Sequence, residues 1–431
     1  MSGGAALDTI VAPATPVGRS ALAIIRIDGP LSVEILASLS GSAPPEPRVA
    51  TLVELRDLDQ CIAIRYAAPH SFTGNDLVEL TLHGNPLLVE QVIRAVTAKG
   101  ARIAEPGEFT ERAVLNGKLD LVQAESIADL IAARTPLQAK LSLGNLEGTL
   151  SRTASALRES LLFVISRLEA VLDFADEGYE FISRDEALAR VQAALRDCES
   201  LAETYRRGRA TTKGLNAVIL GLPNAGKSTL LNRLVGSDRA IVTPIPGTTR
   251  DIVRETIEIG GLPVTLSDTA GLRDVDDVVE GIGIERARSA AESADIVLYL
   301  VDATIGLTAA DRVEIARLPN PLIVYSKTDL APAPPASLST AGLLDTLDAL
   351  VRDRFAAPES SATLVNERQF AAVSECTDAL RDTLASFAEN LDEQMILVDL
   401  HRAANALGVL TGAITRDEIF DEIFANFCIG K

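Results

Sequence analysis

The sequence predicts a mixed fold. An α/β domain covers residues 1–118, and an all-α domain combines residues 119–212 with 367–431. A doubly wound α/β domain over residues 213–366 interrupts the helical one. Three patterns predict this arrangement. Short runs rich in Val, Ile and Leu fill the first part of the chain, helical spacing dominates the middle, and strands alternate with helices after residue 215. A chain of 431 residues has room for about three domains.

In the first domain, the strand candidates are residues 20–27, 60–66 and 77–82, and residues 87–99 have helical spacing that ends at Gly100. From residue 119 to about 209, Ala, Leu, Glu and Arg dominate, and Pro136 is the only proline. Helical character returns near Glu367 and continues to residue 431. We therefore assign both helical stretches to one discontinuous domain.

In the inserted domain, the strand candidates are residues 215–220, 263–267, 296–301 and 322–325. Helical segments separate them, which is typical of a doubly wound parallel sheet. Residues 331–335 read A-P-A-P-P and indicate a loop.

The composition restricts the partners and the compartment. The formal net charge is -20, so this chain is not by itself a broad basic platform for nucleic acid, and any RNA must be held by a local basic patch or a second protein. Cys61, Cys198, Cys376 and Cys428 form no CxxC pair, which predicts a reducing compartment without a zinc site. His70, His83 and His401 are likewise too sparse for a metal site. No signal peptide and no apolar run of about 18 residues is present, which predicts a soluble cytoplasmic protein that does not enter a membrane.

Residues 221–228 read G-L-P-N-A-G-K-S and fit the phosphate-loop motif G-x-x-x-x-G-K-S in full. The motif follows a predicted strand and opens a predicted helix at residues 229–234, which is its required context. Lys227 is expected to reach the β- and γ-phosphates and Ser228 to ligate Mg²⁺. The remaining phosphate-binding positions of this stretch are Asn224, Ala225, Gly226 and Thr229.

Two further motifs support a nucleotide switch. The residues Asp268, Thr269, Ala270 and Gly271 form D-x-x-G at the end of a predicted strand. There the carboxylate can hold Mg²⁺ through water and Gly271 can offer its N–H to the γ-phosphate. Thr248 and Thr249 lie between this motif and the phosphate loop, and Thr249 is the better Mg²⁺ ligand candidate because switch GTPases place a threonine there.

Base recognition is assigned to Ser326, Lys327 and Asp329, where GTPases carry N-K-x-D. Asp329 can accept two hydrogen bonds from guanine that adenine cannot supply, and Lys327 can lie along the base. Ser326 replaces the usual Asn, so one bond to the base or to the loop is expected to be lost. The loop at residues 338–342 could supply a further backbone contact.

The group that orients the attacking water is not settled by the motifs. Ras-like proteins place a glutamine directly after D-x-x-G, and here that position is Leu272, which cannot orient water. Glu280 is near in sequence, but the residues alone favour a solvated surface glutamate at this position.

The chain closely resembles the MnmE (TrmE) family of tRNA-modification GTPases, within the TrmE-Era-EngA-Septin-like superfamily. The resemblance covers nearly the whole chain. Its residues include S-F-T-G at 71–74, E-P-G-E-F-T at 105–110, L-N-G-K-L-D-L at 115–121, G-T-T-R-D at 247–251 and the terminal F-C-I-G-K at 427–431.

The resemblance implies a function that the motifs cannot supply. With the flavoprotein MnmG, in a heterotetramer, such proteins install an aminomethyl or carboxymethylaminomethyl group on C5 of the wobble uridine of certain tRNAs. A 5,10-methylene- or 5-formyl-tetrahydrofolate is bound in the N-terminal domain, through which the homodimer forms. By motif, the folate contacts are Arg26, Glu79, Lys118 and Lys431.

The resemblance also implies activation by potassium. Asn224 would bind K⁺ together with the backbone carbonyls of Thr243 and Ile245 and with Thr248. The water-orienting glutamate of the family aligns with Glu280, which replaces the surface interpretation above. A further set of catalytic candidates comes from family motifs: Arg250 in G-T-T-R-D and Cys428 in the terminal C-x-G-K.

Two other functions stay open at this stage. One is a regulatory GTPase whose flanking domains only bind partners. The other is a folate-binding enzyme related to aminomethyl-transfer proteins, with an appended switch. Asn75 departs from the family pattern, which often has Glu there, and like Ser326 it does not change the assignment.

Overall fold

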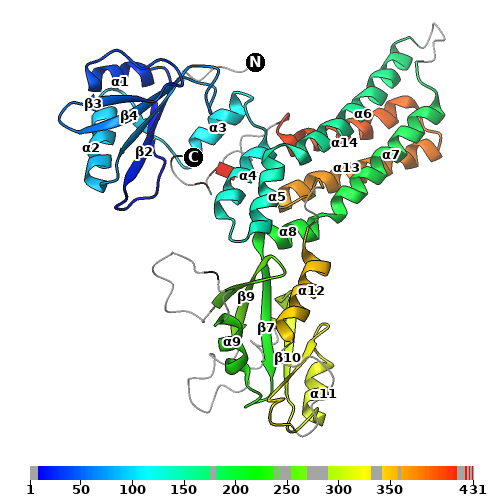
Figure 1. Ribbon diagram of the computed structural model, residues 1–431. Helices are drawn as coiled ribbons and strands as arrows, with labels where there is room; N and C mark the ends of the chain where they lie inside the picture. The colour runs from blue at the N-terminus through cyan, green and yellow to red at the C-terminus, as the bar shows by residue number, and fades with distance from the viewer. Residues whose placement is uncertain are drawn as a thin grey trace, which may run out of the picture. The chain divides into compact units, whose positions relative to one another are not determined.

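The computed structural model describes residues 8–174, 181–236, 239, 241, 254–268, 290–331, 342–357, 361–414, 423–424, 427 and 430. Two compact units arise from the contacts within the chain (Figure 1). The first is Met1–Ala128 with Gly408–Lys431, and the second is Asp129–Leu407. The expected domain boundaries at residues 118, 212 and 366 stay predictions.

The first unit contains a sheet of six strands in the order β3-β4-β5-β2-β1-β6. Neighbouring strands are antiparallel except β1 and β6, which are parallel. The strand bounds are β1 Ile10–Pro13, β2 Leu22–Asp28, β3 Thr51–Leu55, β4 Asp59–Tyr66, β5 Leu77–His83 and β6 Arg102–Ile103. The helices are α1 Ser32–Ser40, α2 Pro86–Thr97, α3 Glu108–Leu115 and the start of α4, Leu121–Ala132.

The two faces of this sheet have different neighbours because side chains alternate along each strand. One face packs Ile25, Ile27 and Leu80 against Ile35 of α1 and Val92 of α2. On the opposite face, α3 covers part of the sheet where buried Phe109 meets buried residues of β1 and β5, with Tyr66 and Phe72 partly buried beside them. Arg26 and Glu79 belong to this second face, since they alternate with Ile25, Ile27 and Leu80.

The second unit begins with a helical region. Its helices are α5 Pro136–Leu146, α6 Thr149–Asp173, α7 Arg184–Glu203, α8 Tyr205–Lys213, α13 Glu367–Ala388 and α14 Glu393–Thr411. Thr135 and Gln138 form a capping box at the start of α5, and Asn366 caps α13. Helices α7 and α13 pack along one another, where the Sγ atoms of buried Cys198 and Cys376 lie 3.6 Å apart.

The remainder of the second unit is an α/β fold. Its sheet has the order β11-β10-β7-β9-β8, all parallel except the antiparallel hairpin of β8 and β9. The strand bounds are β7 Leu215–Gly221, β8 Arg254–Ile259, β9 Leu262–Asp268, β10 Ile296–Asp302 and β11 Leu322–Ser326. The helices named here are α9 Lys227–Val235, α11 Ala309–Ile315 and α12 Leu343–Phe355.

Helices cover both faces of this sheet, which confirms the doubly wound prediction. Leu230 of α9 and Leu347 of α12 share one buried cluster with alternate residues of the strands, such as Ile219. The other face packs Val218 and Tyr299 against a second set that includes Ile315 of α11. Neighbouring buried residues of β7 thus belong to opposite clusters, which places the strand between two apolar layers.

The chain enters and leaves the α/β part at one place. Before β7, the hydroxyl of Thr211 accepts a hydrogen bond from Ala357 N (3.1 Å), and the hydroxyl of Thr212 donates to Val365 O (3.3 Å). Gln138 of α5 also donates to Thr212 O at 2.8 Å. These bonds join the segment that precedes the inserted fold to the segment that follows it.

Most expected elements are present. The strands expected at residues 20–27, 60–66 and 77–82 correspond to β2, β4 and β5, the four strands expected in the inserted fold correspond to β7, β9, β10 and β11, and the second helical stretch begins at Glu367. Cys61, Cys198 and Cys376 are free and buried, which fits core positions. No described helix combines the length and apolar character needed to cross a bilayer.

Candidate functional site

The phosphate loop lies between β7 and α9. Gly221 ends β7 with φ +146°, and a Cβ at that position would collide with the carbonyl of Leu300 on β10. Asn224 and Gly226 have φ of +64° and +92°, in the left-handed region that turns the chain sharply. The turn leads directly into the N-terminus of α9, where free backbone N–H groups and the helix dipole favour an anion.

Lys227 is held over its own loop. Its Nζ donates to Gly221 O at 2.9 Å and to Leu222 O at 3.0 Å, and the residue is only 9% exposed. The ammonium therefore lies over the loop, and phosphate oxygens can take the place of these carbonyls as its partners. Asn224, Ser228 and Thr229 are exposed beside it, and Ala225 is buried.

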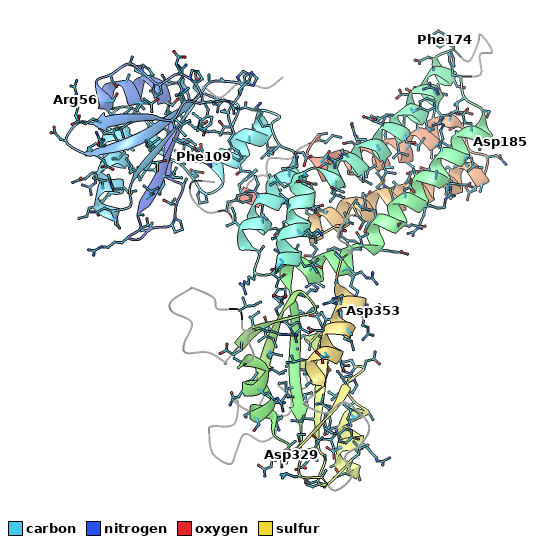
Figure 2. All side chains as sticks on the ribbon, viewed as in Figure 1. Arg56, Phe109, Phe174, Asp185, Asp329 and Asp353 are labelled. Carbon is cyan, nitrogen blue, oxygen red and sulfur yellow. The ribbon has the colours of Figure 1, made fainter. Side chains whose placement is uncertain are left out.

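The expected base-recognition residues surround the end of β11. The Ser326 hydroxyl is buried and donates to Ala225 O at 2.7 Å and to Val301 O at 3.3 Å. The bond to the phosphate loop is thus kept by serine, although one bond was expected to be lost either here or to the base. Asp329 is exposed near the end of this domain in Figure 2.

Lys327 has φ +51°, and its Nζ contacts Asp302 Oδ2 at 2.6 Å. The hydrogen bond from Lys327, followed by one from Thr304, lowers the pKa of Asp302. The lysine stem is therefore anchored at the end of β10, next to β11, so its position is fixed before any base arrives.

A large share of the expected nucleotide residues falls outside the described part of the chain. These are Thr243, Ile245, Thr248, Thr249, Arg250, Thr269, Ala270, Gly271, Leu272 and Glu280, with the loop at residues 338–341. Asp268 is described only as the last residue of β9, in register with Ile219. Within the described ranges, no group of three or more His, Cys, Asp or Glu residues could hold a metal ion.

The first unit brings together a second set of expected residues. Arg26 on β2 and Glu79 on β5 are register partners, and Arg26 Nε donates to Glu79 Oε1 at 2.8 Å. The Tyr66 hydroxyl donates to the other carboxylate oxygen at 3.3 Å. Burial and the Glu79 carboxylate raise the pKa of Tyr66, so this hydroxyl keeps its proton at neutral pH.

Arg26 is not fully satisfied by these contacts. Its guanidinium lies 5.5 Å from the centre of the Phe72 ring, and its Nη1 is buried with no hydrogen-bond partner among the described residues. An unpaired buried donor costs roughly 1–3 kcal/mol, and more when it is charged. The site therefore suits a ligand that presents an acceptor to Arg26 and donors to Glu79, beside an aromatic ring.

Lys118 and Gly430 lie close to segments that border this site. A Cβ built on Gly74 would lie 3.5 Å from Lys118 Cε, which puts this lysine stem at the loop after Phe72. Gly430 approaches Pro13 so closely that a Cβ would collide with its carbonyl, and Pro13 follows Ala12, the register partner of Arg26. Cys428 and Lys431 themselves lie outside the described residues.

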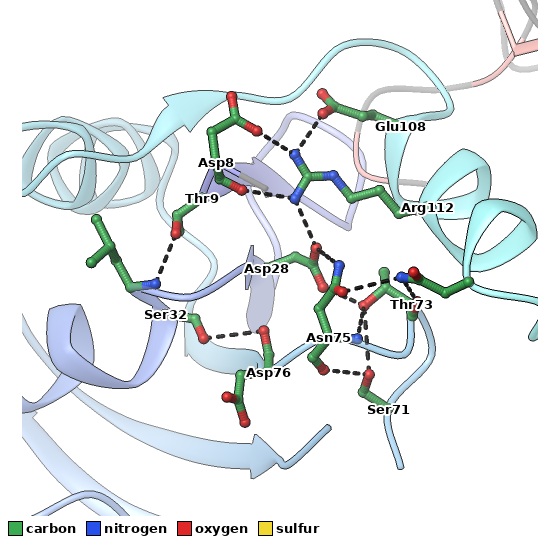
Figure 3. A network of polar contacts seen from close by, with 12 residues as sticks. Asp8, Thr9, Asp28, Ser32, Ser71, Thr73, Asn75, Asp76, Glu108 and Arg112 are labelled. Atoms are coloured by element: carbon green, nitrogen blue, oxygen red, sulfur yellow. Dashed lines mark hydrogen bonds and ion pairs between the residues drawn. The ribbon is translucent and has the colours of Figure 1, made fainter. Parts of the chain in front are cut away.

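A buried polar network supports this loop (Figure 3). Asp28, fully buried at the end of β2, accepts from Arg112 Nη1 (3.1 Å), Asn75 Nδ2 (3.0 Å) and the Thr73 hydroxyl. Asn116 Nδ2, at the end of α3, donates to Thr73 O at 2.7 Å and so links the loop to the segment that carries Lys118. Asn75 acts as a donor to a carboxylate here, a role that a glutamate could not fill.

Two further carboxylates complete the network. Arg112 Nη2 contacts Asp8 Oδ1 at 2.7 Å and Glu108 Oε1 at 2.9 Å, and Arg102 contacts both acids. Burial alone would raise the pKa of Glu108 and of Asp8. The bonds from Arg102 and Arg112 more than offset it, so both pKa values are lowered.

Tyr66, Phe72 and Asp302 are contact residues that the sequence did not reveal. Their partners, Glu79, Arg26 and Lys327, are distant in sequence. The contacts depend on how strands and loops pair in the fold, which local residue spacing does not predict. Strand pairing alone could have placed Tyr66 near Glu79, because β4 and β5 are neighbours. His83 and His401 contact Asp59 and Glu169, which agrees with structural roles.

Comparison with known proteins identifies close relatives. The family description MnmE helical domain matches residues 121–428, and GTP-binding protein TrmE N-terminus matches residues 9–118. The tRNA modification GTPase MnmE of Koribacter versatilis is 39% identical and that of Symbiobacterium thermophilum 40%; each alignment covers 98% of this chain and 99% of the relative. Among solved structures, Aquifex aeolicus Era Y63A bound to GDP.AlF4- is 27% identical over 38% of this chain and 66% of that one. Its TM-score is 0.26, which is too low to show that the two chains share a fold.

Proposed function

This chain belongs to the MnmE family of tRNA modification GTPases, and from that membership we propose a folate-dependent, potassium-activated cycle that modifies the wobble uridine. The protein is a GTP hydrolase that acts in tRNA modification. Two observations carry the finer proposal. The phosphate loop is formed, and in the first unit a buried Arg26 donor has no hydrogen-bond partner among the described residues.

The phosphate loop binds GTP. Lys227 exchanges its two loop carbonyls for phosphate oxygens, and the N-terminus of α9 adds backbone donors. Ser228 and Thr249 would hold Mg²⁺, and Asp329 with Lys327 would select guanine. The hydroxyl of Ser326 ties the base side of the site to Ala225 of the phosphate loop.

A K⁺ ion bound at this loop would supply the positive charge that an arginine finger supplies elsewhere. Asn224, whose exposed side chain stands on the loop in a left-handed turn, would hold K⁺ with Thr243, Ile245 and Thr248. A cation there offsets charge that develops between the β- and γ-phosphates. Glu280 orients the attacking water in place of the missing glutamine, and Arg250 assists. Two G domains that meet face to face would complete this arrangement.

The second site holds the folate. Arg26 and Glu79 present a donor and an acceptor on one face of the sheet, Phe72 offers a ring, and Lys118 with the terminal Lys431 supply positive charge. When bound, the folate supplies the one-carbon unit that is added to C5. The close approach of Gly430 to Pro13 supports a tail that reaches this site, which would place Cys428 near the reaction.

The partners follow from the same membership. The proposed assembly is a homodimer through the first domain, joined by the flavoprotein MnmG into a heterotetramer that acts on tRNA in the cytoplasm. The two sites then have separate tasks: folate chemistry in one unit and GTP-driven movement in the other.

The test uses a strain without the gene, complemented by single variants. We expect Lys227→Ala and Arg26→Met both to abolish wobble modification, measured by nucleoside mass spectrometry of total tRNA. Only Lys227→Ala should lose GTP turnover. Arg94→Met, an exposed arginine paired with Glu90 in the same unit, is the matched control and should modify normally.

The outcomes separate the competing functions. Full modification with Arg26→Met would mean that the flanking domain only binds partners, as in a regulatory GTPase. Full modification with Lys227→Ala would favour a folate enzyme whose switch is dispensable. Equal GTP turnover in KCl and NaCl would remove the potassium proposal and leave the rest intact.

A further inference from the structure

Helix α8 has an unusual charge for this chain. Its nine residues include Arg206, Arg207, Arg209 and Lys213 and no acidic residue, although the whole chain has a net charge of -20. All four cationic residues are exposed, and the residues that the helix buries are the small Gly208, Ala210 and Thr211. The helix therefore turns its cationic side chains outward and packs through small ones.

The last turn of α12 adds to this charge. Arg207 Nη2 donates to the backbone carbonyl of Asp353 at 3.2 Å, and the Arg206 guanidinium lies 5.6 Å from the centre of the Phe355 ring. Arg352 and Arg354 are exposed in the same turn. Figure 1 shows α8 beside the end of α12, and Figure 2 marks Asp353 there. We call the side chains of Arg206, Arg207, Arg209, Lys213, Arg352 and Arg354 the α8 basic surface.

Several partly or fully exposed arginines of the same unit have carboxylate partners. Arg190, Arg381 and Arg402 each contact a carboxylate, at 3.0, 2.8 and 2.7 Å. In the part of the chain that the structure describes, none of the five arginines of the α8 basic surface contacts a carboxylate. The Lys213 ammonium lies 4.0 Å from Asp129. Asp129 and the exposed Asp353 offset part of this charge, and the excess positive charge is available to an external anion.

We propose that the α8 basic surface binds the sugar-phosphate backbone of the tRNA, an inference that rests on the proposed function. A guanidinium group can donate two parallel hydrogen bonds to the oxygens of one phosphate. Cationic side chains that lack an anionic partner also bind nucleic acid favourably because binding releases its counterions. None of the large apolar residues that the structure exposes lies on α8 or in the last turn of α12. A protein partner would be expected to need such residues at the centre of its interface.

This surface also resolves the conflict between an acidic chain and an RNA substrate. Contacts to the sugar-phosphate backbone position an RNA but do not recognise its sequence, so the α8 basic surface would bind many different tRNAs with similar affinity. A helix of nine residues is about 14 Å long at 1.5 Å per residue, so the α8 basic surface can contact only a short stretch of the RNA backbone. The remaining affinity would come from the flavoprotein partner.

The test measures binding of a transcribed tRNA that carries an unmodified wobble uridine to the full chain, alone and with the flavoprotein. The triple variant Arg206→Gln/Arg207→Gln/Arg209→Gln should weaken binding at least tenfold at about 0.1 M salt. It should also flatten the dependence of log affinity on log salt by about 2. Because Arg207 and Arg206 also contact α12, Arg209→Gln/Lys213→Gln serves as a second variant, and it should weaken binding about threefold to fivefold.

The control is Arg381→Gln/Arg402→Gln, an exposed and a half-buried arginine of the same unit that already have carboxylate partners; it should bind tRNA within twofold of the unaltered chain. GTP turnover should be unchanged in all three variants. Equal tRNA affinity of the triple variant and the unaltered chain would overturn the proposal, as would an unaltered chain that binds no tRNA in either setting. Loss of flavoprotein binding with tRNA binding intact would assign the surface to the protein partner instead. A strain whose wobble uridine stays unmodified with the unaltered chain would contradict the proposed function itself, which separates the two failures.

Discussion

The two candidate sites place a buried cation in different ways. In the inserted fold, Lys227 lies in a loop whose backbone does the positioning, and its ammonium already has carbonyl partners at Gly221 and Leu222. In the first unit, Arg26 is positioned by strand register and by Glu79, and one of its nitrogens has no partner in the described residues. Backbone conformation is encoded by neighbouring residues, whereas register depends on distant strands. The first site is therefore a local motif and the second a product of the whole sheet.

The largest expected effect breaks the first site alone. Lys227→Ala should reduce GTP turnover by about a hundredfold or more, because a charged donor that meets transition-state charge on phosphate oxygens is removed. Folate affinity, measured by calorimetry with 5-formyl-tetrahydrofolate, should stay within twofold. A parallel loss of folate binding would show that the two sites are not independent.

A second variant breaks the other site alone. Glu79→Gln should lower folate affinity about tenfold, since it replaces the carboxylate acceptor of the bond from Arg26 with a neutral amide oxygen and changes the partner of Tyr66. Tyr66→Phe is the milder companion and should cost about threefold. The measurement is the same calorimetric titration, with GTP turnover as the control that must not change.

A smaller effect concerns the base side of the phosphate loop. Ser326→Ala leaves the Ala225 carbonyl without its hydroxyl donor, which costs about 1 kcal/mol and should weaken GTP binding about fivefold. Ser326→Asn restores a donor with the residue that GTPases usually carry and should bind at least as tightly as serine. If the Ser326→Ala variant binds GTP as tightly as the unaltered chain, the hydrogen bond to Ala225 does not contribute to GTP affinity.

The smallest effect is a pH dependence in the first unit. Glu108 and Asp8 have lowered pKa values in the folded state, so the stability they contribute is present above their unfolded values near 4. It is lost as the pH falls through the folded values. The protection of the α3 peptide against hydrogen exchange, measured relative to the intrinsic exchange rate, should therefore fall as the pH drops below about 4. In Glu108→Gln this fall should be weaker, and an unchanged pH profile would contradict the assignment.

The same contrast explains what sequence could and could not predict. The elements around the phosphate loop were predicted closely because each depends on residues within a few positions, such as Gly221, Gly226 and Lys227. In the first unit, β1, β3 and β6 were missed; β1, for example, is a run of only four residues that gains its stability from β2 and β6. Arg26 and Glu79 were found only through the family resemblance, because no local pattern links residues 53 positions apart. The partners Tyr66 and Phe72 required the structure.

The bonds that join Thr211 and Thr212 to Ala357 and Val365 have a consequence for how the protein could be rebuilt. Because of these bonds, the two ends of the nucleotide-binding fold lie next to each other. Deleting that fold would therefore leave only a short gap between the helical segments on either side. A linker of a few residues should close that gap, and the entropy of closing a loop grows only with the logarithm of its length. The helical region should therefore tolerate an inserted domain of a different size at this position, so the nucleotide-binding domain could be exchanged while the helical region stays unchanged.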